Sequence, residues 1–157
     1  MKAASLKELK LELATLHPQK VLELCMHLAK YKKENKELLT YLLFESNNEE
    51  SYIKDIKDII DEQFLGLNKT NVYLAKKTIR KVLRTTNKFI KYSGIKQTEV
   101  ELLIYFCKKI RKTRIPLHIN TVLGNLYFRQ MQRIKKALST LHEDIQFDYS
   151  DDIKILQ

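Results

Sequence analysis

Residues 70–92 separate apolar from basic side chains almost completely when they are placed on a helix. At about 100° per residue, Val72, Ile79, Val82 and Ile90 fall on one side, and a run of Lys and Arg falls on the other. This segregation is typical of an amphipathic helix on the surface of a globular domain. We therefore predict a helix with one buried face and one basic face.

Helical spacing of apolar residues recurs along the rest of the chain. Only three Gly and two Pro among 157 residues leave few turn signals. We expect an all-α protein of about seven antiparallel helices, arranged as a compact bundle or as a short α-solenoid of stacked hairpins. The other predicted helices span residues 6–15, residues 18 to about 31, residues 36–45, residues 49–65, residues 98–112 and residues 120–141.

Several local signals support these boundaries. Ser5 and Glu8 have the spacing of a capping box, and Gly94 is suited to a left-handed helix cap. Residues 98–112 are apolar on nearly every side, which predicts a helix in the centre of the domain. Gly124 lies inside a helical pattern, so either that helix begins later or another helix crosses closely there.

Charge divides the predicted single domain of residues 1–157 into three parts. Residues 66–141 hold eighteen Lys and Arg but only two carboxylates, Glu99 and Glu101, whereas residues 1–65 are nearly neutral. Residues 142–157 are acidic and lack a periodic apolar stripe, so we expect this tail to be loosely ordered or to lie on basic surface. The net charge of +10 is informative about binding partners and solubility, but it does not indicate the fold.

Motifs for catalysis or metal binding are absent from the sequence. It has no Gly-rich phosphate loop, no G-x-S-x-G elbow and no H-E-x-x-H zinc motif. Cys25 and His27 would lie about 200° apart on a helix, and Cys25 and Cys107 are expected to be core thiols. We predict no cofactor, no metal and no enzymatic activity. The chain shows no secretory signal or membrane span, so we expect a soluble cytoplasmic protein without a membrane partner.

The basic face is the main functional candidate. Regularly spaced cations can contact phosphates without reading base sequence, and Tyr73 and Phe128 could stack on bases. The predicted nucleic-acid-binding residues are Lys77, Arg80, Lys81, Arg84, Lys88, Lys91, Arg129, Arg133 and Lys136.

Three alternatives stay open for this face. An acidic protein partner could bind it, or could bind a groove between stacked helices, which would make the protein an interaction scaffold. The charge could serve only solubility. Asp55, Asp58 and Glu62 share a helix face and could neutralise the neighbouring basic helix. The oligomeric state does not follow from the sequence.

The first forty residues carry a resemblance. Ser5-Leu6-Lys7-Glu8-Leu9-Lys10, Leu13, His17-Pro18 and Leu22-Glu23-Leu24 resemble the first hairpin of small, uncharacterised all-helical bacterial proteins. The resemblance implies helices and brings no known activity or functional residue with it.

Overall fold

The computed structural model describes residues 1–68 and 70–157, and every regular element in this part of the chain is helical. The predicted all-α class is confirmed. The chain divides into two compact units, unit 1 (Met1–Phe44) and unit 2 (Glu45–Gln157). The expectation of a single domain stays a prediction. Within the described residues, every helix is too short or too polar to span a bilayer.

Unit 1 contains three α-helices and most of a π-helical turn, but it has almost no core. The predicted capping box is confirmed, because the side chains of Ser5 and Glu8 bond to each other's backbone amides. Tyr41 is the only fully buried residue among residues 1–44, all of which the structure describes. The elements are α1 (Leu6–Thr15), α2 (Pro18–Tyr31), α3 (Lys33–Thr40) and the π-helical turn (Tyr41–Glu45).

Three predictions for unit 1 are wrong. The third helix begins at Lys33 rather than at Lys36, and Leu42 and Leu43 are exposed rather than buried. Cys25 is exposed as well, so it is not the core thiol that we expected. The two errors in burial share one cause, because the helices of this unit do not enclose their apolar faces.

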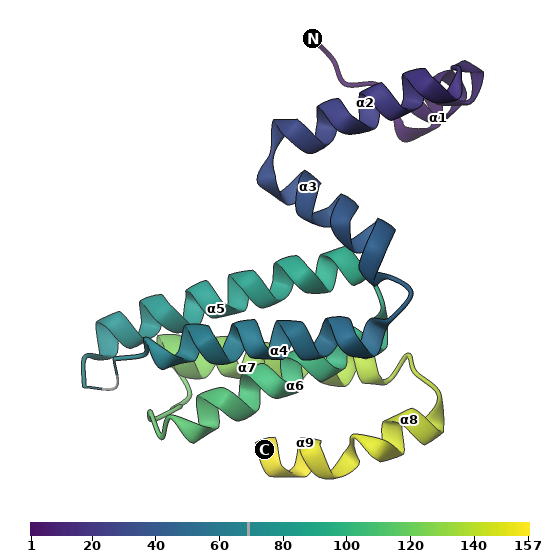
Figure 1. Cartoon of the computed structure of the whole chain (residues 1–157). Coiled ribbons are helices and arrows are strands. Elements are labelled where there is room, and N and C mark those ends of the chain that lie inside the picture. Colours follow the sequence, from purple (N-terminus) through teal and green to yellow (C-terminus); the bar gives the residue numbers. More distant parts are fainter. Residues whose placement is uncertain (69) are drawn as a thin grey trace. The chain divides into compact units, whose positions relative to one another are not determined.

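Unit 2 is built around one central helix, α6 (Lys96–Lys112), which packs against α4, α5, α7 and α9. Figure 1 shows α4, α5, α6 and α7 side by side. Leu103, Phe106 and Cys107 of α6 have no exposed surface, so the predicted central position is confirmed. Burial raises the pKa of the Cys107 thiol to about 12. The other helices are α4 (Glu49–Leu65), α5 (Val72–Ser93), α7 (Val122–Leu138), α8 (Glu143–Asp148) and α9 (Ser150–Leu156).

The entry into α7 explains Gly124. Thr121 caps the helix by accepting a hydrogen bond from the Gly124 amide, and its hydroxyl donates to the His118 carbonyl at 2.7 Å. A Cβ on Gly124 would lie 1.9 Å from that carbonyl oxygen. The three described atoms nearest to that Cβ all belong to His118 and Thr121, so the close neighbour is the loop before α7.

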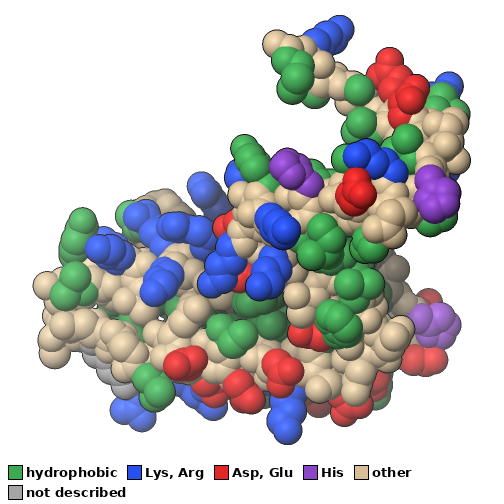
Figure 2. All heavy atoms as spheres, turned by 45° about the horizontal axis from the view of Figure 1, so that its top comes forward, with side chains coloured by type: hydrophobic (Ala, Val, Ile, Leu, Met, Phe, Trp, Pro, Cys, Tyr) green, Lys and Arg blue, Asp and Glu red, His purple; other side chains and the backbone are tan. Residues whose placement is uncertain are grey.

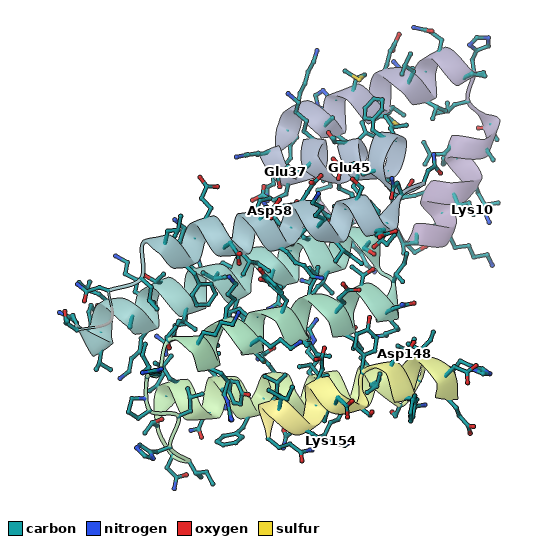
Figure 3. The ribbon with its side chains drawn as sticks, turned by 60° about the horizontal axis from the view of Figure 1, so that its bottom comes forward. Lys10, Glu37, Glu45, Asp58, Asp148 and Lys154 are labelled. Carbon is teal, nitrogen blue, oxygen red and sulfur yellow. The ribbon has the colours of Figure 1, made fainter. Side chains whose placement is uncertain are left out.

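The acidic tail folds into α8 and α9, and α9 packs on α6. Asp152 pairs with Lys108 at 2.6 Å, and the buried Tyr127 hydroxyl donates to the Leu156 carbonyl at 2.7 Å. Figure 3 labels Asp148 and Lys154 on these helices. The expectation of loose order is wrong, and the alternative, a tail lying on basic surface, agrees with the ion pair to α6.

Candidate nucleic-acid interface

Helix α5 positions most of the predicted cations. It begins after Asn71, whose side chain accepts hydrogen bonds from two backbone amides of the first turn, and it ends at Gly94. Gly94 has a φ of 68°, so the predicted left-handed cap is confirmed. Ala75, Ile79 and Val82 are completely buried and fix the orientation of the helix.

The opposite face of α5 is basic and open to solvent. Lys77, Arg80, Lys81, Arg84 and Lys91 are all exposed. Neither α5 nor α7 contains a carboxylate. Within the part of the chain that the structure describes, none of these five side chains forms an ion pair. Figure 2 shows several Lys and Arg side chains close together on one part of the surface and several carboxylates below them.

Lys88 differs from the other cations of α5. Its side chain is half-buried, and its ammonium nitrogen lies 4.7 Å from the centroid of the Phe89 ring. The same nitrogen lies 6.0 Å from the Tyr92 ring, so Lys88 has cation–π contacts within the fold. We therefore leave Lys88 out of the candidate interface.

Helix α7 contributes two exposed cations and one structural one. Arg129 and Lys136 are exposed. Arg133 is half-buried, and its guanidinium donates to Glu99 at 2.6 Å and to Asn87 at 2.5 Å. Because Arg133 joins α7 to α5 and α6, it is a packing residue rather than an open phosphate contact. The sequence could not separate Arg133 from Arg129, which lies one turn earlier.

A groove of about 370 Å³ runs between α5 and α7. Arg80 and Arg129 line it from the two helices, and Leu83 and Leu126 form apolar parts of its wall. The sequence did not predict the two leucines as site residues. Their position at the border between apolar and polar faces was the available signal, but the sequence does not tell which helix lies opposite.

The acidic residues of α4 do not neutralise the basic face of α5, although the sequence allowed this alternative. Asp55, Asp58 and Glu62 are exposed, and among the described residues none of them pairs with α5. Asp61 of α4 instead pairs with Lys109 of α6 at 2.6 Å. Helix α6 also forms the ion pair Lys57–Glu101 with α4 at 2.5 Å and the ion pair Lys108–Asp152 with α9 at 2.6 Å.

Burial and hydrogen bonds from cations have opposite effects on the pKa of two carboxylates of unit 2, Glu99 and Asp61. Burial raises the pKa of Glu99, but hydrogen bonds from Lys96 and Arg133 outweigh it, so this pKa lies below its ordinary value. The same balance, with Lys109 and Tyr105 as donors, lowers the pKa of Asp61. Both carboxylates are therefore ionised at neutral pH and stay paired with internal cations.

The two predicted stacking residues lie on different surfaces. Tyr73 is 75 % exposed and is seven residues, or about two turns, before Arg80 on the same face of α5. Phe128 directly precedes Arg129, so it points about 100° away from it around α7. Its ring packs edge-on against Tyr127 at 5.9 Å. Only Tyr73 shares the basic face of α5.

No arrangement typical of metal binding was found among the described residues, since no three or more His, Cys, Asp or Glu side chains cluster there. A hollow of about 970 Å³ lies between the N-terminal halves of α4 and α6. Two of its carboxylates have internal partners, because Glu49 accepts from Thr98 at 2.6 Å and Glu101 pairs with Lys57. Comparison of the chain with family models, curated proteins and solved structures gave no match.

Proposed function

We propose that the protein is a non-enzymatic module that binds nucleic acid through the basic face of α5 and α7. The observation that carries this proposal is the set of exposed cations without carboxylate partners on both sides of the α5–α7 groove. The interface consists of Lys77, Arg80, Lys81, Arg84 and Lys91 on α5, with Arg129 and Lys136 on α7.

The spacing of these cations suits a polyanion. Lys77 and Lys91 are separated by about 21 Å at a rise of about 1.5 Å per residue. A nucleic-acid strand presents several phosphates over that length. Each cation that replaces a condensed counterion adds affinity that falls with salt. Arg80 and Arg129 can each bind a phosphate with two parallel hydrogen bonds, which fixes the strand along the groove.

Tyr73 favours single strands over duplex. Its exposed ring can stack on an unpaired base, an interaction of about 1–3 kcal/mol that tolerates any base. In a duplex the bases are stacked on each other, so this contribution is lost. We expect binding without sequence preference and a stronger affinity for single-stranded oligonucleotides.

Fluorescence anisotropy with labelled single-stranded and duplex oligonucleotides tests the proposal. We expect micromolar binding at about 50 mM salt and a steep loss of affinity by about 200 mM. The variant Arg80→Gln/Arg84→Gln/Arg129→Gln should bind at least about tenfold more weakly, and its salt slope on duplex should fall by about 2–3. The matched control Lys2→Gln/Lys7→Gln/Lys10→Gln removes the same charge from exposed positions of unit 1.

Two results would contradict nucleic-acid binding at this face. One is the absence of binding at micromolar protein and low salt. The other is an equal loss of affinity in the two triple variants, because the effect would then come from net charge alone. Unchanged circular dichroism in both variants is expected, since all six side chains are exposed.

An acidic protein partner for the same face predicts a different pattern. Poly-glutamate would then bind as tightly as an oligonucleotide of equal charge, and Tyr73→Ala would weaken neither complex. For nucleic acid we expect Tyr73→Ala to weaken single-strand binding several-fold and to leave poly-glutamate binding unchanged. This pair of titrations separates the two partners.

A further inference from the structure

Unit 1 exposes apolar side chains that have the helical spacing of core residues. None of the helices α1, α2 and α3 contains a buried residue. Leu6, Leu28 and Leu43 keep 86 %, 59 % and 59 % of their surface exposed. A unit of this size cannot enclose a stable core without help from another surface. These faces therefore have the properties of an interaction surface.

Helix α2 is apolar over more than half of its circumference. Its polar residues, among them Lys20, Glu23 and His27, fall within an arc of about 100° on a helical wheel. The remaining arc is apolar, although Leu22 and Met26 are 54 % and 45 % exposed. A helix with so wide an apolar surface normally packs on more than one neighbour. The only helix with extensive contacts to α2 is α3, within the described residues.

A groove of about 550 Å³ lies between α2 and α3. Met26 of α2 and Leu39 of α3 line it, and the π-helical turn adds Leu43 and Phe44. Phe44 is 76 % exposed. A π-helical turn inserts an extra residue into each turn and is frequent at functional sites. Every residue that lines this α2–α3 groove belongs to unit 1.

Four lysines surround the α2–α3 groove, and no carboxylate lines it. Lys30, Lys32, Lys33 and Lys36 are all exposed. Lys33 has a weak pair with Glu37 at 3.8 Å, and the Lys32 nitrogen lies 5.9 Å from the Tyr31 ring. An apolar floor with a positive rim is complementary to an apolar stripe with carboxylates beside it.

We propose that the α2–α3 groove binds an amphipathic helix of another protein, one whose apolar stripe is flanked by Asp and Glu. An apolar groove between two adjacent helices can bind the apolar face of a third, amphipathic helix. The lysine rim then meets the carboxylates of the bound helix and sets its orientation. This site is separate in sequence and in chemistry from the basic face of α5 and α7.

Two other occupants fit less well. In a symmetric dimer through this groove, the four lysines of one copy would face those of the other, and like charges oppose such contacts. An anionic membrane binds amphipathic helices that are basic on one face and apolar on the other. Such a helix must insert a projecting apolar face into the membrane, whereas the apolar residues here line a groove. Charge and shape together favour a single acidic helix.

The test uses a synthetic helical peptide of about 18 residues, or roughly five turns. Its probe form has Leu and Phe at every third or fourth position and Glu beside them. One control peptide replaces each Glu by Lys, and another scrambles the sequence so that the stripe is lost. We expect saturable micromolar binding of the acidic peptide by full-length protein and at least about tenfold weaker binding of both controls. No saturation by about 1 mM would overturn the proposal.

Variants of the groove locate the binding site. Leu43→Ser/Phe44→Ser should weaken binding of the acidic peptide at least about tenfold, because it removes apolar contact from exposed positions. Leu22→Ser, which is exposed on α2 outside the groove, is the matched control and should leave binding unchanged. Equal effects of the two variants would overturn the assignment to this groove.

Charge reversal sharpens the assignment. Lys30→Glu/Lys36→Glu should weaken the acidic peptide at least about tenfold and improve binding of the Lys-substituted peptide. Lys7→Glu/Lys10→Glu on α1 is the control, with Lys10 labelled in Figure 3. The variant Arg80→Gln/Arg84→Gln/Arg129→Gln should not change peptide binding, so this proposal and the nucleic-acid proposal can fail separately.

Two further measurements identify the competing occupants. Sedimentation equilibrium measures whether the protein is a dimer. If it is a dimer and Leu43→Ser/Phe44→Ser converts it to a monomer, a second copy occupies the groove. That result would overturn the acidic-helix proposal. Phosphatidylserine vesicles test for a membrane. If the protein binds the vesicles but not the peptide, and the same variant abolishes vesicle binding, the acidic-helix proposal is overturned in favour of a membrane. A monomer that binds the peptide and not the vesicles supports it.

Discussion

Unit 1 and unit 2 share the same helical spacing of apolar residues, but only unit 2 buries them. In α6, Leu103 and Phe106 have no exposed surface, whereas Leu9 of α1 is 47 % exposed in an equally regular stripe. The difference does not come from propensity or capping, since α1 has a complete capping box. It comes from neighbours, because α6 contacts four helices of its own unit. Amphipathic spacing thus predicts a helix, and the surrounding helices decide whether its stripe becomes a core or an interface.

The largest expected contrast is between matched leucines of the two units. Leu103→Ala should lower the free energy of unfolding by about 2–5 kcal/mol, because it leaves a cavity inside unit 2. Leu9→Ala should change it by less than about 0.5 kcal/mol, since the side chain is already in water. Urea unfolding followed by circular dichroism measures both. A large loss in Leu9→Ala would show that α1 is covered by other residues.

A glycine of unit 2 should give the next largest effect. Gly124→Ala places a Cβ 1.9 Å from the His118 carbonyl oxygen, so the loop before α7 must move. We expect a loss of about 1–3 kcal/mol, which is typical of overpacking at a site without room. Gly66→Ala is the control, because the nearest described atom to its new Cβ would be the Gln63 carbonyl oxygen at 3.9 Å. Equal melting temperatures for the two variants would contradict this packing.

Ion pairs of the two units should also differ in how much they stabilise the fold. Glu99 is 8 % exposed and accepts hydrogen bonds from Lys96 at 2.8 Å and from Arg133 at 2.6 Å. Glu99→Gln should lower the free energy of unfolding by about 1.5–3 kcal/mol. In unit 1, Glu23 pairs with Lys20 at 3.0 Å, but both side chains are more than half exposed. Glu23→Gln should therefore change stability by less than about 1 kcal/mol.

The same carboxylates predict how the two units respond to acid. The pKa values of Glu99 and Asp61 lie below their ordinary values, so each group stabilises the fold at neutral pH. That contribution is lost as the pH falls from the ordinary pKa through the lowered one. The melting temperature of unit 2 should fall in this range, and less steeply in Glu99→Gln. An unchanged acid slope in Glu99→Gln would show that other groups dominate.

Acid should act only locally in unit 1. Hydrogen bonds from the Ser5 hydroxyl and the Ser5 amide lower the pKa of the fully exposed Glu8. Protonation of Glu8 therefore weakens the cap of α1 and does not disturb a core. Nuclear magnetic resonance at decreasing pH should show the first turn of α1 changing independently of α6.

Signals confined to a few neighbouring residues were readable from the sequence. The Ser5–Glu8 capping box, the left-handed Gly94 and the central position of α6 each depend on local pattern, and all are confirmed. Features that depend on distant contacts were not readable. The tail becomes helical because Leu156 is buried beside Tyr127, which lies 29 residues earlier.

The candidate site shows the same limit. Arg129 and Arg133 lie one turn apart on α7 and look alike in the sequence, but Glu99 of α6 reaches only Arg133. The acidic face of α4 was also a reasonable partner for α5 from charge alone. In the structure Asp61 of α4 pairs with Lys109 of α6, whereas Lys77, Arg80, Lys81, Arg84 and Lys91 of α5 are exposed.

The smallest expected change in stability comes from removing the side-chain cap of a helix in each unit. Ser5→Ala and Thr121→Ala each remove a side-chain oxygen that accepts a first-turn amide, which costs about 1 kcal/mol. Because α1 buries no residue, the loss in Ser5→Ala should stay in its first turn and appear as roughly fivefold faster amide exchange there. Because α7 is part of the core of unit 2, the loss in Thr121→Ala should lower its global unfolding free energy. A global loss in Ser5→Ala would mean that α1 is coupled to a core after all, and the contrast between the units would no longer hold.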